Sequence, residues 1–360
     1  MKNIFLVAGE VSGDKTGGWY LDKLKQSNIN VNCQAVGGSF LKKSGAKLYD
    51  RLEKLNIAGI FEILFKLRFI FGFLKKLASY ILKNDFDEIV LIDFPGFNLR
   101  LAKILKKANP NLKITYLSPP QLWVWGKWRI KKLKKYCDKV IVLYPFEVDW
   151  YKKNGLEVEY LGNPVFDKIK KYDFFKNEKK YDQIAIIPGS RQFEVYKMLP
   201  IFLAVAKKFK LAYPKIKIIL PLAESLSSHF IEEKIKKFGF YRWGNDIKIV
   251  RGEKEKLKEL SKCCFAITKV GTVSLEVALL GIPAVVLYKG SWITYFLARS
   301  FIKIKYMALP NLFLEKSVYP EFIQWDCKPD KIFNKAKESY KKGLIQRESF
   351  KDLYDQFLIP

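Results

Sequence analysis

Histidine is almost missing from this sequence, because His229 is the single one in 360 residues. A Ser-His-Asp triad needs its histidine beside a nucleophile, and a zinc site usually needs more than one imidazole or thiolate ligand. His229 stands in a polar stretch, which favours a surface or partly buried place at a helix over a catalytic role. We therefore expect any general base in this protein to be a carboxylate.

Two further absences narrow the class of protein. Five cysteines form an odd number without a C-x-x-C spacing, which indicates neither a disulfide framework nor a thiolate zinc site. No stretch reaches the ~18 uninterrupted apolar residues of a membrane span, and the apolar N-terminal stretch is too short for a signal peptide. We expect a protein that stays on the cytoplasmic side of any membrane that it contacts.

Acidic side chains are scarce relative to basic ones. The chain carries 65 lysines and arginines against 36 aspartates and glutamates, a net charge of +29. Such an excess favours an anionic partner or surface. A lysine-rich composition without functional meaning is the alternative.

Two glycine-containing turns, at residues 9–14 and 188–191, lie about half a chain apart. Each follows a short apolar stretch, at 4–8 and 184–187, that is typical of a buried strand. A loop in this place has free backbone N–H groups and the positive end of a helix, which suit phosphate or sugar oxygens. The pair of turns predicts two similar α/β halves that face a shared cleft.

Further apolar stretches alternate with helix-length segments, which predicts parallel sheets with helices on both faces, in two Rossmann-like domains. A polar, lysine-rich stretch at 168–182 follows a turn and indicates the domain boundary. We expect domains at 1–168 and 176–335. A helical segment at 336–360 would follow them, and its packing back on the first domain is left open. The other expected strands are 89–92, 114–117, 140–143, 216–220, 265–268 and 284–288.

Asp93 is the first candidate for the general base. It ends an expected strand and so projects from the carboxyl edge of the sheet, where α/β proteins bind ligands. Phe94 and Phe97 flank it, and partial desolvation favours the neutral carboxyl group and makes the carboxylate a stronger base. The alternative is an N-cap for a helix that starts near Leu99. Glu10 is the reserve candidate.

Three tryptophans, Trp123, Trp125 and Trp128, lie within six residues directly after an expected strand. Indole faces suit apolar acyl chains or the C–H faces of sugars, whereas the neighbouring Lys127 and Arg129 suit a phosphate. Ordinary core packing of one or two of these tryptophans is an equal alternative.

The second half offers a comparable set of polar groups. Ser190 and Arg191 complete its glycine turn, and Gly271 follows another expected strand. If a helix begins near Thr272, its free N–H groups can hold a diphosphate, and Glu276 one turn later can accept hydrogen bonds from ribose hydroxyls. This is the arrangement expected of a nucleotide-sugar donor site.

Seven motifs occur in a fixed order along the chain. They are Gly9-Glu10-x-Ser12-Gly13-Asp14; Asp93-x-Pro95-x-Phe97-Asn98; Ser118-Pro119 with Trp123-x-Trp125 and Arg129; Pro145-Phe146-Glu147; Pro188-Gly189-Ser190-Arg191-x-x-Glu194; Gly271-Thr272-x-x-Leu275-Glu276; and Leu309-Pro310-Asn311 through Pro320-Glu321-x-x-Gln324. In this order they resemble the pattern of the lipid-A-disaccharide synthase family, from residue 7 to about residue 325.

The resemblance implies an inverting glycosyltransferase of the GT-B type that needs no metal and no cofactor. It would move 2,3-diacylglucosamine from UDP to 2,3-diacylglucosamine 1-phosphate, giving the β-1,6-linked disaccharide of lipid A and UDP. By the same resemblance the first domain would bind the acceptor and face the membrane, and the second would bind the UDP-sugar. A homodimer is left open.

The resemblance also implies roles for single residues. Asp93 would take the proton of the acceptor's 6-hydroxyl. Two departures from the family pattern, Val270 and Pro120, put a hydroxyl contact in doubt at each place. The implied acceptor residues are Ser12, Gly13, Asn98, Ser118, Trp125 and Arg129, and the implied donor residues are Gly189, Ser190, Arg191, Gly271, Thr272, Glu276, Asn311 and Gln324.

Membrane contact is indicated independently by residues 61–76, where aromatic and leucine side chains at helical spacing alternate with basic ones. This pattern is expected of an interfacial helix on anionic lipid, here the inner face of the inner membrane, with Phe65, Phe69, Phe71 and Phe73 as the inserting candidates. A buried core helix is the alternative, but the basic residues make full burial costly.

Two other functions share part of this pattern. A UDP-sugar 2-epimerase of similar fold would use the nucleotide half, yet it does not need an aromatic surface for acyl chains. A nucleic-acid-binding protein would explain the charge and the aromatic residues, but the sequence contains no recognised module of that kind, so we expect no nucleic-acid partner.

Overall fold

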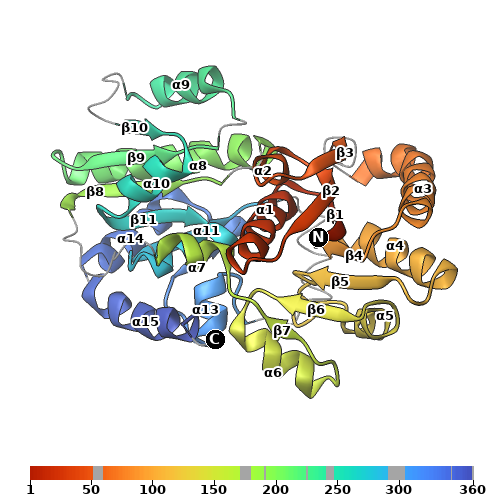
Figure 1. Ribbon diagram of the computed structural model, residues 1–360. Helices are drawn as coiled ribbons and strands as arrows, with labels where there is room; N and C mark the ends of the chain where they lie inside the picture. Colours follow the sequence, from red (N-terminus) through yellow and green to blue (C-terminus); the bar gives the residue numbers. More distant parts are fainter. Residues whose placement is uncertain are drawn as a thin grey trace. The chain divides into compact units, whose positions relative to one another are not determined.

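The computed structural model describes residues 1–51, 60–170, 180–189, 192–223, 226–240, 247–290, 305–341 and 343–358. The chain divides into two compact units, Met1–Pro164 and Val165–Ile359 (Figure 1). Each unit contains one parallel sheet with helices, which confirms the α/β class with two Rossmann-like halves. The predicted domain limits at 168, 176 and 336, and the roles assigned to the domains, stay predictions.

The sheet of the first unit has seven parallel strands in the order β3-β2-β1-β4-β5-β6-β7. Buried apolar side chains form its central strands, as the sequence predicts for 4–8, 89–92 and 114–117, while the strand expected at 140–143 ends one residue earlier. The strands are β1 (Lys2–Ala8), β2 (Val31–Gly37), β3 (Lys47–Arg51), β4 (Glu88–Ile92), β5 (Lys113–Leu117), β6 (Lys139–Val142) and β7 (Glu159–Tyr160).

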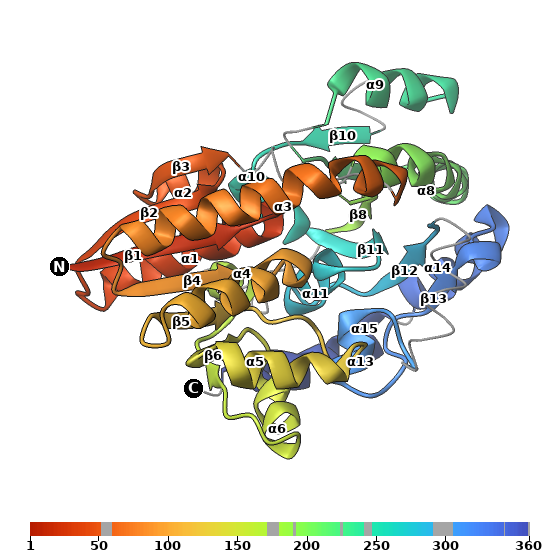
Figure 2. The ribbon, with the colours of Figure 1, turned by 90° about the vertical axis from the view of Figure 1, so that its right-hand side faces the viewer.

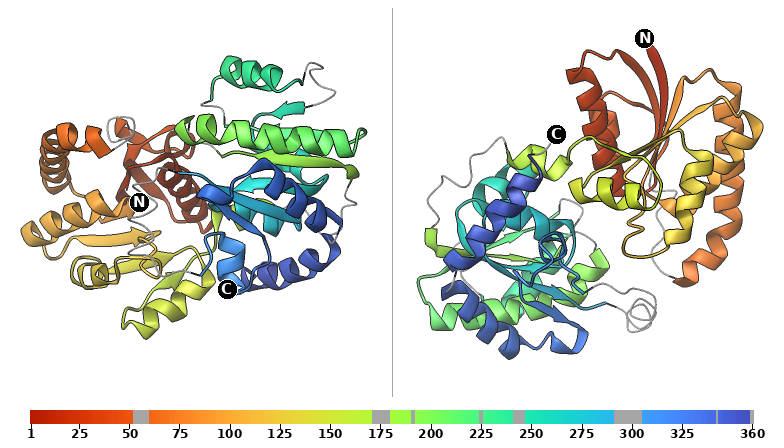
Figure 3. Two further views of the ribbon diagram at one scale, coloured as in Figure 1. Left: turned by 180° about the vertical axis from the view of Figure 1, so that it is seen from behind. Right: turned by 90° about the horizontal axis from the view of Figure 1, so that it is seen from below.

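Alternate residues of β1 pack into different cores, one on each face of this sheet. Ile4 and Leu6 join the core under the first two helices, whereas Phe5 and Val7 join the core under the next three. Figure 3 (right) shows this separation, with the red α1 on one face and the orange helices on the other, and Figure 2 shows α3 beside α4. The helices are α1 (Val11–Gln26), α2 (Ser39–Lys43), α3 (Ile60–Lys83), α4 (Pro95–Ala108), α5 (Ile130–Tyr136) and α6 (Pro145–Lys153).

The sheet of the second unit has six parallel strands in the order β10-β9-β8-β11-β12-β13. The apolar stretches expected at 184–187, 265–268 and 284–288 are confirmed as strands, and the stretch expected at 216–220 shifts by one residue. The strands are β8 (Lys180–Ile187), β9 (Lys217–Pro221), β10 (Ile247–Val250), β11 (Cys263–Lys269), β12 (Ala284–Tyr288) and β13 (Glu321–Ile323).

Helices cover this second sheet as well, and the largest core lies between its strands and α8, α9 and α14. His229 is exposed in the first turn of α9, in agreement with the surface role expected for it. The helices are α7 (Pro164–Ile169), α8 (Gln192–Ala212), α9 (Ser228–Lys237), α10 (Glu253–Leu260), α11 (Thr272–Leu279), α13 (Leu309–Phe313), α14 (Pro329–Lys341) and α15 (Gly343–Gln356).

The C-terminal segment is helical, as its spacing predicts, and forms α14 and α15. Phe350 of α15 is fully buried and packs its ring against Tyr319, with centroids 5.2 Å apart. Phe166 packs in the same way against Tyr354 and Phe357. These contacts lie within the second unit. Over the described residues, none of the helices combines the length and the apolar character that a bilayer span requires.

Candidate functional sites

Asp93 follows β4 directly and stands at the carboxyl edge of the first sheet, as predicted. Its φ is 48° and that of Phe94 is 46°, so two successive residues other than glycine adopt the left-handed conformation. Such strain costs on the order of 1–3 kcal/mol per residue and persists where neighbouring groups hold it, often at active sites. Helix α4 begins at Pro95 with Phe94 as its N-cap, so the alternative of Asp93 as an N-cap is wrong.

Two buried side chains hold the backbone of Asp93 in place. The amide nitrogen of Asn98 donates to the carbonyl oxygens of Asp93 at 2.9 Å and of Ile92 at 3.1 Å. The hydroxyl of Tyr116 donates to the same Asp93 carbonyl at 2.7 Å. Asn98 is fully buried, and its Oδ1 has no hydrogen-bond partner among the described residues. Its contacts therefore support the Asp93 backbone.

The first glycine turn lies beside Asp93, because β1 and β4 are paired strands whose ends Ala8 and Ile92 are in register. The ring of Phe94 occupies the space that a Cβ on Gly9 would need, which explains a glycine at this close approach. Glu10 is the N-cap residue of α1 and is half-buried. The fold thus brings the base candidate and its reserve to neighbouring loops.

The other residues of that turn have different surroundings. Ser12 is exposed and Gly13 is buried. The buried Asp14 carboxylate accepts hydrogen bonds from three backbone N–H groups at the start of α2, those of Gly38, Phe40 and Leu41 at 2.7, 3.0 and 3.1 Å. Part of the first motif therefore has a structural function, which is to fasten α1 to α2.

A buried carboxylate that the sequence analysis does not assign, Glu147, holds the tryptophan loop. Its Oε1 accepts a hydrogen bond from Trp123 Nε1 at 3.0 Å, and its Oε2 accepts one from the backbone of Tyr144 at 3.2 Å. Burial raises the pKa of Glu147 to about 7, although both hydrogen bonds lower it. The only sequence signal is its place in a motif directly after β6.

Past Trp123 the loop exposes an aromatic and basic surface. The Arg129 guanidinium lies 4.7 Å from the ring centroid of Trp125 and 5.8 Å from that of Trp128. The two indoles pack edge to face and are 39% and 56% exposed. Ser118, which starts the loop, is half-buried with a φ of 55°. Trp123 is half-buried and packs its ring against Phe146, whereas Trp125 and Trp128 are exposed and available to a ligand or surface.

In the second unit, α11 begins at Thr272, as predicted, and Gly271 is its N-cap. Gly271 has a φ of 133°, a backbone conformation that would be strained in a residue with a side chain. Thr272 is exposed. The other glycine turn follows β8 with Gly189 half-buried. Ser190 and Arg191 lie outside the described residues.

A lysine that the sequence analysis missed joins these two loops. Lys269, the last residue of β11, forms an ion pair with Glu194 in the first turn of α8. Its Cδ lies 3.0 Å from the position of a Cβ on Gly189. The ion pair fixes the spacing of the loops after β8 and β11.

Glu276 is nearly buried, with 9% of its surface exposed. Its carboxylate pairs with Lys256 of α10, at 2.9 Å from Oε1 and 3.1 Å from Oε2. The sequence predicts the carboxylate but gives no signal for its partner.

Asn311 and Gln324 differ sharply in how their amides are used. Asn311 is fully buried. Its Nδ2 donates to the carbonyl oxygen of Tyr319 at 2.7 Å and to the Glu321 carboxylate at 2.8 Å, and its Oδ1 accepts a hydrogen bond from the backbone N–H of Tyr319 at 2.7 Å. Gln324 is 1% exposed with a φ of 52°, and neither of its amide atoms has a partner among the described residues. An unsatisfied buried amide costs about 1–3 kcal/mol, which marks Gln324 as a candidate ligand contact and Asn311 as its structural neighbour.

The fold is shared with several solved structures. A complex of S. aureus MnaA with UDP matches with a TM-score of 0.60 at 14% identity, over 97% of this chain and 91% of that one. Acinetobacter baumannii MurG matches with a TM-score of 0.54 at 14% identity, over 99% of each chain. These likenesses define the class of fold, the two-domain GT-B architecture of glycosyltransferases and UDP-sugar epimerases.

Sequence similarity is more specific. The family model of lipid-A-disaccharide synthetase matches residues 4–358. Lipid-A-disaccharide synthases of Coxiella burnetii and Rickettsia typhi are 32% and 33% identical, over 96% and 94% of this chain and 92% and 89% of those proteins. The chain belongs to the lipid-A-disaccharide synthase family and is a glycosyltransferase of lipid A biosynthesis. The epimerase and nucleic-acid alternatives are not favoured.

The buried Glu147 predicts a pH-dependent stability. Its pKa in the unfolded chain is near the ordinary 4.5 and rises to about 7 on folding, so the folded state retains the proton to higher pH. The free energy of unfolding should therefore fall by roughly 2–3 kcal/mol between about pH 5 and pH 8 through this group alone. Chemical denaturation at both pH values should show a smaller fall for Glu147→Gln. The exposed Glu157→Gln is the control, and equal falls in all three proteins would contradict the assignment.

Proposed function

We propose that Asp93 is the general base of a transfer in which the acceptor's 6-hydroxyl attacks the anomeric carbon of UDP-2,3-diacylglucosamine. The acceptor is 2,3-diacylglucosamine 1-phosphate. The hydroxyl proton passes to the Asp93 carboxylate, a β-1,6 C–O bond forms with inversion, and the bond between the anomeric carbon and the diphosphate oxygen breaks to release UDP. The observation that carries this proposal is the backbone of Asp93, held at the sheet edge by Asn98 and Tyr116.

The donor belongs in our proposal to the second unit. The N-terminal end of α11 at Gly271 and Thr272 offers free N–H groups to the diphosphate. The turn that contains Gly189 and Ser190 would also bind the donor, and Arg191 in the same turn would supply a cation for the phosphates. Glu276 would accept hydrogen bonds from the ribose. The amide of Gln324, which has no hydrogen-bond partner among the described residues, would bind the nucleotide or sugar. Asn311 would act indirectly, because its hydrogen bonds position Tyr319 and Glu321, which lie shortly before Gln324 in the chain.

The acceptor belongs in our proposal to the first unit. Ser12 and Gly13 lie in the first turn of α1, which follows β1, and Ser118 directly follows β5. Strands β1 and β5 flank β4, which precedes Asp93. The exposed Trp125 and the Arg129 guanidinium stacked on it suit an acylated sugar phosphate. Asn98 contributes by fixing Asp93.

Contact with the inner face of the inner membrane is proposed for α3. Phe69 and Phe71 are 49% and 45% exposed, and Lys75 and Lys76 are exposed beside them. Phe73 is 7% exposed and packs against Phe97, with ring centroids 6.1 Å apart. Phe73 is therefore a core residue, and the prediction that it inserts into the membrane is wrong. The side chain of Phe65 lies outside the described residues. The homodimer stays a prediction.

Removal of the proposed base should abolish most turnover. Asp93→Asn should keep the fold and UDP binding but lower turnover by on the order of 10²-fold or more, because an amide cannot accept the proton. A transfer assay with both acylated sugars, alongside calorimetry with UDP, measures the two properties. Asp22→Asn, an exposed position on α1, is the control. Near-normal turnover of a folded Asp93→Asn protein would move the base to Glu10 or to solvent.

The buried amide of Gln324, which has no partner in the described part of the chain, gives a prediction in which affinity and stability move in opposite directions. Gln324→Leu should weaken UDP binding by about tenfold, a typical cost of a lost hydrogen bond, yet leave the thermal midpoint equal or higher, since a buried unsatisfied amide is removed. Arg191→Ala should weaken UDP binding through the phosphates. The adjacent exposed Trp325→Phe serves as control. Unchanged UDP affinity in both variants would place the donor elsewhere.

Membrane contact can be tested on α3 itself. Phe69→Ser with Phe71→Ser should release the protein from anionic liposomes, because each exposed ring can contribute roughly 1.5–3 kcal/mol of apolar transfer. High salt alone should weaken sedimentation only in part. Leu82→Ser, at an exposed position of the same helix, should bind like the unaltered protein. A folded double variant that still sediments fully would assign the contact to another surface.

A further inference from the structure

The partner of Glu276 comes from a helix that is otherwise outside the proposed donor site. Lys256 and Glu276 are 20 residues apart, on α10 and α11, and their side chains are 19% and 12% exposed. The ammonium lies within hydrogen-bond distance of both carboxylate oxygens, at 2.9 and 3.1 Å. Glu253 is a second, weaker partner of Lys256 at 3.4 Å.

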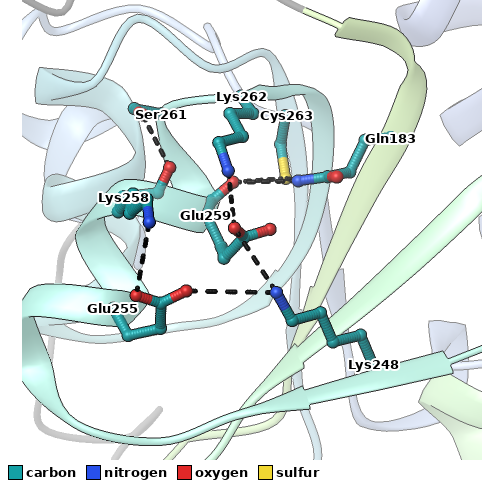
Figure 4. Close-up of polar contacts among 8 residues, drawn as sticks. All are labelled: Gln183, Lys248, Glu255, Lys258, Glu259, Ser261, Lys262 and Cys263. Atoms are coloured by element: carbon teal, nitrogen blue, oxygen red, sulfur yellow. Dashed lines mark hydrogen bonds and ion pairs between the residues drawn. The ribbon is translucent and has the colours of Figure 1, made fainter. Parts of the chain in front are cut away.

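Helix α10, which carries Lys256, is held in place at its C-terminal end by the contacts of Glu259 that Figure 4 shows. The Glu259 carboxylate accepts a hydrogen bond from Lys262 at 2.6 Å and lies 3.5 Å from Lys248 of β10. The Glu259 carbonyl accepts one from Gln183 of β8 at 3.0 Å. Because β8 and β10 both contact the end of α10, the backbone that carries Lys256 has a defined position.

The pair also has an electrostatic effect on the neighbouring helix end. Glu276 lies one turn after Thr272, where the proposed diphosphate would carry negative charge. An isolated buried carboxylate at this place would repel the diphosphate and would be costly to keep ionised. A carboxylate offers about four lone-pair positions, so the lysine leaves acceptor positions for hydroxyl groups.

Lys256 is able to supply this charge at neutral pH. Burial lowers the pKa of Lys256, but the carboxylates of Glu276 and Glu253 outweigh that effect and raise the pKa above its ordinary value. The ammonium therefore stays protonated while the nucleotide binds.

We propose that Lys256 is a positioning residue for the donor: it compensates the charge of the Glu276 carboxylate and holds that carboxylate in an orientation that suits the ribose hydroxyls of UDP. The inference rests on the proposed function, because it assumes that UDP binds at α11. Lys256 lies outside the seven sequence motifs from which the other donor residues were inferred.

The test compares UDP with 2′-deoxy-UDP, which lacks one of the ribose hydroxyls. Calorimetry should show that Lys256→Met weakens UDP binding by about tenfold or more but weakens 2′-deoxy-UDP binding less, because part of the ribose contact is already missing there. Lys256→Arg should restore most of the affinity for UDP. The matched control is Lys258→Met on the same helix, whose 62% exposed side chain lies 3.9 Å from Glu255 and which should bind both nucleotides normally.

Each contrary outcome has a distinct meaning. Equal losses for the two nucleotides, or unchanged UDP affinity, in a folded Lys256→Met protein would overturn the role of Lys256 and leave the donor site standing. Failure of the unaltered protein to bind UDP would overturn the proposed donor site and the inference with it. If Lys256→Met does not fold, Lys256→Gln, which keeps a donor but no charge, decides by the same comparison.

Discussion

Parallel pairing of the strands is the constraint on which the functional geometry depends. Every pair among the described strands is parallel, in both sheets. The chain must therefore return by a crossover after each strand, and all loops that follow strands meet at one edge of their sheet. Asp93, Ser118 and the first glycine turn share such an edge in the first unit, and Gly189 and Gly271 share one in the second. Parallel pairing thus makes neighbours of loops that are far apart in the sequence.

Charged groups near these edges are buried only with specific partners. Glu147 accepts hydrogen bonds from an indole N–H and a backbone N–H, which are uncharged donors, and burial raises its pKa in spite of them. Glu276 is shielded by an ammonium, which compensates its charge outright. Asp14 uses three backbone N–H groups. The difference matters for function, because a carboxylate beside bound phosphates gains from a cation, whereas a carboxylate that only anchors a loop needs donors of fixed direction.

The sequence predicts the elements well where apolar stretches are short and a glycine follows within two residues, as for β1 and β11. Asp93 and Thr272 could be found because Asp93 directly follows a strand and Thr272 lies three residues after one, and strand ends are visible in a sequence. Phe73 could not be separated from Phe69 by composition. Both lie on one stripe of α3, four residues apart, and only the packing of α3 on α4 decides which of them is covered. Pairs such as Lys256 with Glu276 depend on tertiary distance, and no pattern along the chain encodes it.

The excess of basic residues, finally, is not a direct measure of attraction to an anionic surface. Lys256, Lys262 and Lys269 are committed to internal carboxylates, and their charges are largely neutralised where they lie. Membrane attraction must come from cations that remain at the surface, such as Lys75 and Lys76 beside the exposed phenylalanines of α3. Screening by salt acts mainly on such exposed charges and only weakly on the buried pairs. Ionic strength should therefore modulate binding to lipid far more than it modulates the internal geometry of the donor site.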